Sequence, residues 1–236
     1  MSDQVKTQWI SVIAHDGSAY DAYLALPPAG TGPGLVLFQE IFGVNAHIRS
    51  VAEQYALAGF VVLAPDVFWR QQRRAELGYE GTEREQAITL MKATEPAALA
   101  ADIRTTVAAL RARPETAGQK VGAFGYCMGG RLAFVAAAQG GVDAALAYYG
   151  GGIQNILDQA AHITVPMMFH YAGHDPAIPP EAVAQVQAAL QGKVATFHHY
   201  PPAHHGFNCW ARAAYHPASA ALALGRSLSF LAEHLF

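Results

Sequence analysis

The sequence predicts an α/β fold: a mostly parallel, twisted sheet with helices on both faces. Short, wholly apolar runs at 35–38 and 60–64 are typical of strands that are buried on both sides. Helical patterns alternate with these runs along the chain. A further short apolar run, 121–124, leads into a glycine-rich turn and an alanine-rich helical stretch. In such sheets the reactive groups gather at the carboxyl ends of the strands.

In the first half, segments 9–14 and 20–26 are predicted strands, because the turn 15–18 between them suits a hairpin. Segment 46–58 is a predicted helix that Gly59 ends. Pro96 fits the first position of a further helix. Apolar side chains then recur at helical spacing through Arg111, at Leu99, Ile103, Val107 and Leu110.

In the second half, further strands are predicted at 143–148, 165–170 and 195–200. Helices are predicted at 181–190 and 217–235. No repeat, low-complexity tract or linker interrupts the 236 residues, so we expect a single domain over 1–236.

Composition narrows the class of protein. An apolar fraction of 52% with 14% charged residues is enough for a well-buried core. The net charge is −3, from 15 basic and 18 acidic residues, and there is no basic run, so nucleic acid and acidic membrane surfaces are not expected as partners. The polar start and the lack of a long apolar stretch predict a cytoplasmic protein. No exposed apolar helix stripe stands out, which makes a monomer the expected state.

The two cysteines, Cys127 and Cys209, lack a CxxC partner, so we expect neither a metal nor a cofactor. A disulfide between them would be unusual in a reducing cytoplasm. Cys127 lies in Gly125-Tyr126-Cys127-Met128-Gly129-Gly130, between a predicted strand and a predicted helix. Strand, Gly-x-nucleophile-x-Gly and helix form the nucleophile elbow of α/β-hydrolases, here with cysteine for serine. The alternative without catalysis is a glycine-rich turn that holds an inert buried cysteine.

The elbow supplies two things that an acyl transfer needs. The helix dipole favours a thiolate, and the Met128 N–H can face a developing oxyanion. Gly125 and Gly129 remove side chains that would collide with the backbone around the turn. A second oxyanion N–H is expected from Ile41, in the loop after strand 35–38. Glu40 in that loop either caps a helix or braces the loop, or it meets the thiol and affects its ionisation.

A cysteine nucleophile needs a base and a group that orients the base. Asp175 follows a predicted strand and suits the acid, although an ordinary turn aspartate is the simpler alternative. His204 and His205 compete for the base. We favour His205, because Gly206 leaves room beside it and Phe207 can anchor the loop.

The chain resembles the dienelactone hydrolases (carboxymethylenebutenolidases) over nearly its full length. The resemblance rests on Gln39-Glu40-Ile41-Phe42-Gly43-Val44-Asn45, Ala64-Pro65-Asp66, Arg84-Glu85-Gln86-Ala87, the cysteine elbow, Tyr148-Tyr149-Gly150, Gly173-His174-Asp175 and His205-Gly206-Phe207. It implies the α/β-hydrolase fold and hydrolysis of a small lactone or ester without cofactor or metal, such as dienelactone to maleylacetate. It also implies that Cys127 attacks, His205 acts as base and Asp175 orients it. Glu40 would hold the resting thiol and move away when substrate arrives.

Substrate recognition is where this sequence departs from the family. Its best-known members hold the substrate carboxylate with two arginines, of which one matches Arg84. The other would lie four residues after the catalytic histidine, where this chain has Cys209. Arg212 either replaces it or faces solvent, and Tyr126 either lines the pocket or belongs to the core. Arg84 itself could instead be a surface residue paired with Glu80 or Glu83.

Two rival functions stay open. A related hydrolase with a reshaped pocket would act on other small esters. In the second, Cys127 would be a redox-sensing thiol, or the scaffold a binding module without catalysis.

Overall fold

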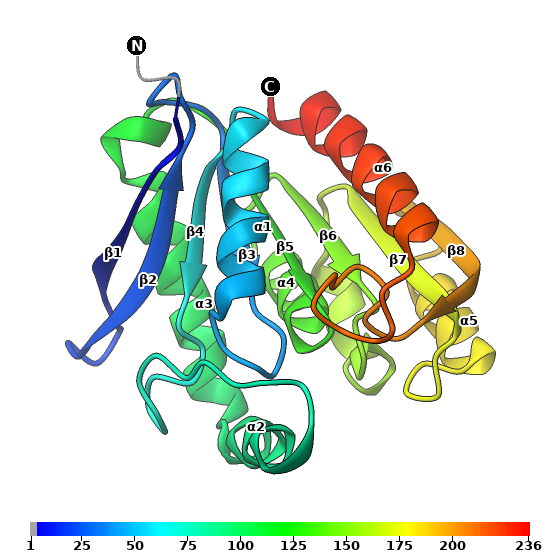
Figure 1. Cartoon of the computed structure of the whole chain (residues 1–236). Helices are drawn as coiled ribbons and strands as arrows, with labels where there is room; N and C mark the ends of the chain where they lie inside the picture. The colour runs from blue at the N-terminus through cyan, green and yellow to red at the C-terminus, as the bar shows by residue number, and fades with distance from the viewer. Residues whose placement is uncertain (1–3) are drawn as a thin grey trace. The chain divides into compact units, whose positions relative to one another are not determined.

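The computed structural model describes residues 4–236, which form two compact units, Met1–Gly122 and Ala123–Phe236 (Figure 1). A single domain over 1–236 stays a prediction.

The first unit contains four strands in the order β1 (Lys6–Ile13), β2 (Ala19–Leu26), β4 (Val61–Pro65) and β3 (Gly34–Phe38). The predicted hairpin is confirmed, since β1 and β2 pair antiparallel. β2 also pairs antiparallel with β4, whereas β3 and β4 are parallel. Every residue of β3 and β4 is buried, which explains why both read as unbroken apolar runs.

Helices cover both faces of these strands: α1 (Ala46–Leu57) lies on one face and α3 (Pro96–Arg111) on the other (Figure 1). α1 begins at Asn45, whose side chain accepts a hydrogen bond from the Ile48 N–H. α2 (Gly81–Ala93) follows a long irregular connection from β4, residues 66–80. A short 3₁₀ turn, Pro114–Thr116, follows α3.

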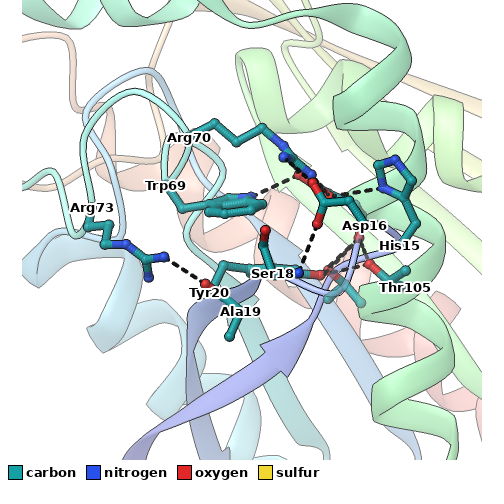
Figure 2. A network of polar contacts seen from close by, with 11 residues as sticks. His15, Asp16, Ser18, Ala19, Tyr20, Trp69, Arg70, Arg73 and Thr105 are labelled. Carbon is teal, nitrogen blue, oxygen red and sulfur yellow. Dashed lines mark hydrogen bonds and ion pairs between the residues drawn. The ribbon is translucent and has the colours of Figure 1, made fainter.

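A buried carboxylate, that of Asp102, ties this connection to α3. Asp102 accepts hydrogen bonds from Trp69 Nε1 at 2.8 Å and from Arg70 Nη2 at 3.0 Å. Arg70 also pairs with Asp16 of the β1–β2 turn at 2.8 Å (Figure 2). The Trp69 ring stacks on Tyr20 with ring centroids 5.4 Å apart. Residues 66–80 are therefore fixed although they form no regular element.

The second unit contains β5 (Val121–Tyr126, which starts at the end of the first unit), β6 (Ala144–Tyr148), β7 (Met167–His174) and β8 (Ala195–His204), in this order. β6, β7 and β8 are parallel. The helices are α4 (Met128–Gln139), α5 (Pro180–Ala189) and α6 (Pro217–Leu235), with 3₁₀ turns at Ile153–Asn155 and Leu157–His162.

The predicted ends of two strands were wrong. β7 runs to His174 rather than 170, and β8 runs to His204 rather than 200. The two pair as far as His174 and His204, with an irregularity after Ala172. β8 is the last strand in the order, so Pro201 and Pro202, which lack an N–H, are tolerated there.

A chain of buried polar groups crosses the core of the second unit. Ser227 on α6 donates to the Ala223 carbonyl at 2.8 Å and lies 2.7 Å from the Tyr148 hydroxyl and 2.9 Å from His170 Nε2. His170 Nδ1 lies 2.7 Å from the Tyr200 hydroxyl. Because the Ser227 proton is used on Ala223, Tyr148 and His170 Nε2 must be the donors to Ser227, and Nδ1 accepts from Tyr200.

No helix among residues 4–236 has the length and apolar character needed to cross a membrane.

Candidate active site

Cys127 occupies a strained turn between β5 and α4. Its backbone has φ 55° and ψ −116°, a left-handed φ that only two other non-glycine residues among 4–236 share. Its N–H donates to the Tyr148 carbonyl at 3.0 Å, and its own carbonyl accepts from Gly130 at 3.0 Å. Met128 is the first residue of α4, so its N–H belongs to the turn whose donors have no partner within the helix.

A glycine that the sequence analysis did not single out allows this turn to form. A Cβ on Gly130 would lie 2.7 Å from the Tyr148 carbonyl oxygen and 3.0 Å from the Gly150 Cα. Both are backbone atoms and cannot move aside easily. In the sequence, only the consecutive pair Gly129-Gly130 indicated this close approach, because the elbow pattern requires Gly129 but no second glycine at position 130.

His205 and Asp175 form a short hydrogen bond. His205 Nδ1 lies 2.6 Å from Asp175 Oδ2, and Asp175 Oδ1 accepts from the Ala177 N–H at 2.9 Å. Asp175 directly follows β7 and His205 directly follows β8. With Nδ1–H donated to the carboxylate, Nε2 is left for the thiol.

The protonated form of His205 is favoured by its partners. Burial lowers the pKa of His205, but hydrogen bonds to Asp175 and Cys127, together with the charges of both, outweigh burial and raise it to about 10. Cys127 is therefore one of the groups that favour the imidazolium. An imidazolium beside a cysteine stabilises the thiolate, which is the nucleophilic form.

The surroundings of the two candidate histidines differ. His204 is exposed and ends β8, with its ring 5.2 Å from that of His174. His205 is only partly exposed, and the next residue, Gly206, has φ 84°. Phe207 is fully buried, as an anchor of the loop should be. The structure thus brings Cys127, His205 and Asp175 together and leaves His204 outside.

Tyr149 is a neighbour of this group whose backbone was not foreseen. It has φ 36°, and its buried ring lies 5.1 Å from the His205 ring and 5.3 Å from Phe207. Its N–H donates to the His170 carbonyl at 2.8 Å. Tyr149 therefore forms part of the wall against which the imidazole packs.

Glu40 and Ile41 lie in the first unit, directly after β3. Glu40 is 1% exposed and Ile41 is partly exposed. The N-cap of α1 is Asn45, so Glu40 does not cap that helix. The Asn45 amide also donates to the Tyr79 hydroxyl at 3.1 Å, which ties the end of this loop to the 66–80 connection.

Arg84 lies in the first turn of α2, and its side chain is exposed. The alternative in which it pairs with Glu80 or Glu83 is not realised among residues 4–236. Instead, the Glu83 carboxylate lies against Gly78. An exposed guanidinium near a helix start can bind an anion through charge-assisted hydrogen bonds.

Arg212 packs in the second unit, where its guanidinium lies against Gly206, the residue after His205. Tyr126 is 1% exposed, with its ring 4.6 Å from Tyr148 and 6.0 Å from Tyr149. Cys209 is fully buried, and both cysteines are free thiols, so the disulfide alternative is not realised.

The chain is similar to known proteins over nearly its whole length. The family model of the dienelactone hydrolase family matches residues 20–235. A carboxymethylenebutenolidase of Pseudomonas putida is 35% identical over 228 residues, 96% of each chain. Carboxymethylenebutenolidase 1 of Cupriavidus pinatubonensis is 33% identical over 225 residues, covering 94% of this chain and 95% of its own.

A crystal structure from Klebsiella pneumoniae, of a protein assigned as a dienelactone hydrolase, is 29% identical and superposes with a TM-score of 0.87 over 98% of this chain and 99% of its own. The predicted α/β-hydrolase fold is confirmed. Both the sequence and the structure match members of this family over nearly the whole chain. The chain therefore belongs to the dienelactone hydrolase family and is a hydrolase.

Proposed function

We propose that this enzyme opens a small lactone or ester through a thioester on Cys127, with dienelactone as the substrate to test first. The single observation that carries the proposal is the short hydrogen bond between His205 and Asp175, on an imidazole whose pKa is raised also by Cys127 in the strained turn before α4. The family names of its relatives support the substrate class.

In the first half-reaction the thiolate attacks the carbonyl carbon, a C–S bond forms, and the carbonyl π electrons move to oxygen. The N–H groups of Met128 and Ile41 would receive that oxyanion. When it collapses, the ring C–O bond breaks and the enolate leaves with the proton of the His205 imidazolium, so that neutral imidazole remains beside the thioester.

In the second half-reaction, water attacks the thioester. His205 accepts the water proton, and the C–S bond breaks to return the thiolate and release the open-chain dicarboxylate. Asp175 holds the imidazole in the tautomer that this step requires. Glu40 would meet the resting thiol and give way when substrate binds.

Substrate recognition is assigned to Arg84 and Arg212. The exposed guanidinium of Arg84 suits a carboxylate, and Arg212 lies against Gly206, directly beside the base. Tyr126 is 1% exposed, so it would support the substrate pocket from the core rather than contact the substrate directly. We expect Arg84→Ala to raise KM more for carboxylate-bearing substrates than for neutral esters; an equal rise in both would remove Arg84 from recognition.

The test is kcat/KM on cis- and trans-dienelactone and on a neutral aryl acetate, for wild type, Cys127→Ser and Cys127→Ala. Cysteine-dependent preference for the dienelactones supports the proposal. Undiminished turnover by Cys127→Ala would overturn the mechanism.

A second candidate is hydrolysis of other small esters, favoured by the buried, uncharged Cys209 where the family's second arginine would stand. Cysteine-dependent turnover of the aryl ester alone would select it. The remote alternative, a redox-sensing thiol, predicts a thiol titration that is unchanged by His205→Asn.

We also propose that the enzyme works as a cytoplasmic monomer without cofactor. Two free thiols suit a reducing compartment. Cell fractionation and sedimentation of the purified enzyme test compartment and oligomeric state.

A further inference from the structure

The side chain of Gln39, which is 0% exposed, joins two backbone groups of opposite kind. Its Oε1 accepts from the Val67 N–H at 3.1 Å, and its Nε2 donates to the Glu40 carbonyl at 3.2 Å. A backbone N–H can only donate and a carbonyl can only accept, so a single amide orientation satisfies both. The amide therefore bridges the 66–80 connection to the peptide that follows residue 40.

That peptide contains the Ile41 N–H, the proposed second donor to the oxyanion. The Glu40 carbonyl and the Ile41 N–H belong to one planar peptide unit, and a trans peptide directs them oppositely. A hydrogen bond that fixes the oxygen consequently fixes the direction of the N–H. Gln39 controls the aim of the Ile41 N–H without touching it.

The far end of the bridge is held firmly. Asp66 accepts from the Phe68 N–H at 3.1 Å and from the Arg74 N–H at 2.6 Å, which closes the turn that contains Val67. Trp69 and Arg70 in the same turn donate hydrogen bonds to Asp102 on α3. Val67 thus presents its N–H from a rigid support.

The same connection also holds the other end of the loop. The Leu77 N–H donates to the Phe42 carbonyl at 3.0 Å, and Gly43 forms a bridge with Glu76. Gly43 has φ 85°, and a Cβ there would collide with the Ala75 carbonyl. The peptide between residues 40 and 41 is therefore fixed on both sides by residues 66–80.

We propose that Gln39 is a positioning residue that aims the Ile41 N–H at the substrate oxyanion. The inference rests on the proposed function, in which Ile41 supplies that N–H. Oxyanion donors accelerate a reaction because they are already oriented when the charge develops. A misaimed Ile41 N–H would weaken transition-state binding more than ground-state binding.

The test uses Gln39→Glu and Gln39→Met, with Gln71→Glu as the matched control. Glutamate keeps the size and the acceptor for Val67 but places an oxygen against the Glu40 carbonyl. Gln71 lies on the same connection and donates to the Ala93 carbonyl at 3.0 Å from an exposed position. We expect both Gln39 variants to lose about 10–100-fold in kcat with KM nearly unchanged, and Gln71→Glu to behave as wild type.

Two further readouts separate aiming from general damage. A trifluoromethyl ketone forms a tetrahedral adduct with an oxyanion, so its affinity should fall by the same factor as kcat/KM. Alkylation of Cys127 by iodoacetamide forms a C–S bond with loss of iodide and no oxyanion, so its rate should not change.

Unchanged kcat in both Gln39 variants would overturn the inference. So would a parallel fall of turnover, ketone affinity, alkylation rate and Tm. Failure of the proposed function looks different, because Cys127→Ala would then retain turnover in the wild-type background.

Discussion

His205 Nδ1 lies 2.6 Å from Asp175 Oδ2, and the Asp175 side chain is 1% exposed. This bond joins residues that directly follow two neighbouring parallel strands, β7 and β8. Since β7 and β8 pair as far as His174 and His204, with an irregularity after Ala172, the strand pairing brings Asp175 and His205 close together.

Asp175→Asn should retain the fold but lose about 10²–10⁴-fold in kcat, because an amide can stabilise the wrong imidazole tautomer. Steady-state kinetics measures the loss, and near-UV circular dichroism checks the fold. Asp158→Asn, on a 3₁₀ turn of the same unit, is the control. Wild-type kcat in Asp175→Asn would remove Asp175 from the triad.

The pH dependence of stability should report the His205 site. The pKa of His205 is raised from 6.5 to about 10, so its protonated form stabilises the folded state fully below 6.5, and this contribution is lost as pH rises through about 10. Urea unfolding of wild type and His205→Asn across this range should therefore show the largest difference at the acidic end. A difference that grows toward pH 10 contradicts the imidazolium assignment.

The titration of Asp66 should change the free energy of unfolding with pH in the direction opposite to that of a paired surface carboxylate. Burial raises its pKa to about 6, against hydrogen bonds from the Arg74 and Phe68 N–H groups that lower it. The folded state thus binds the Asp66 proton more tightly than the unfolded state, so its contribution to stability grows as pH falls from about 6 toward 3.8. Asp66→Asn should lose this gain. An identical pH profile of unfolding free energy in wild type and variant would show that Asp66 does not titrate there.

Two helical glycines form a matched pair. Gly130→Ala should cost about 1–3 kcal/mol or more, because the new Cβ meets the backbone of Tyr148 and Gly150. Gly225→Ala on α6 should stabilise the protein by about 0.5–1 kcal/mol, because a Cβ there meets no atom within 4 Å. Thermal unfolding of the two variants compares them directly, and equal Tm values would refute the steric argument.

Ser227→Ala should destabilise the second unit by about 2–4 kcal/mol, because the buried donors of Tyr148 and His170 lose their shared acceptor. Ser229→Ala is the control, since Ser229 makes the same kind of bond to a carbonyl four residues earlier but is exposed. Urea unfolding measures both, and a loss as large in Ser229→Ala would assign the effect to the helix rather than to the network.

Sequence patterns predicted those features whose physical cause lies in neighbouring residues. Wholly buried strands must be apolar at every position, so β3 and β4 were predicted from composition alone. The Gly-x-Cys-x-Gly pattern at 125–129 predicted the turn at Cys127, where the structure has a left-handed φ. The order of nucleophile, acid and base along the chain placed Asp175 and His205 after strands, where the structure has them.

Features that depend on distant partners could not be predicted in this way. β8 continues through two prolines because nothing pairs with its outer edge among residues 4–236, which depends on strand order rather than on composition. Gly130 is required by the approach of α4 to the end of β6, and Arg212 lies on Gly206 because the loop folds back. The Gln39 bridge joins residues 28 apart.

Adjacent residues and their order along the chain were enough to predict the α/β class, the turn at Cys127 and the position of Asp175 and His205 after strands. The way Gln39 orients the peptide before Ile41, the raised pKa of His205 and the need for glycine at 130 depend on the folded structure. Hydrogen bonds, charge and contact act through space, and the chain sets those distances only once it is folded.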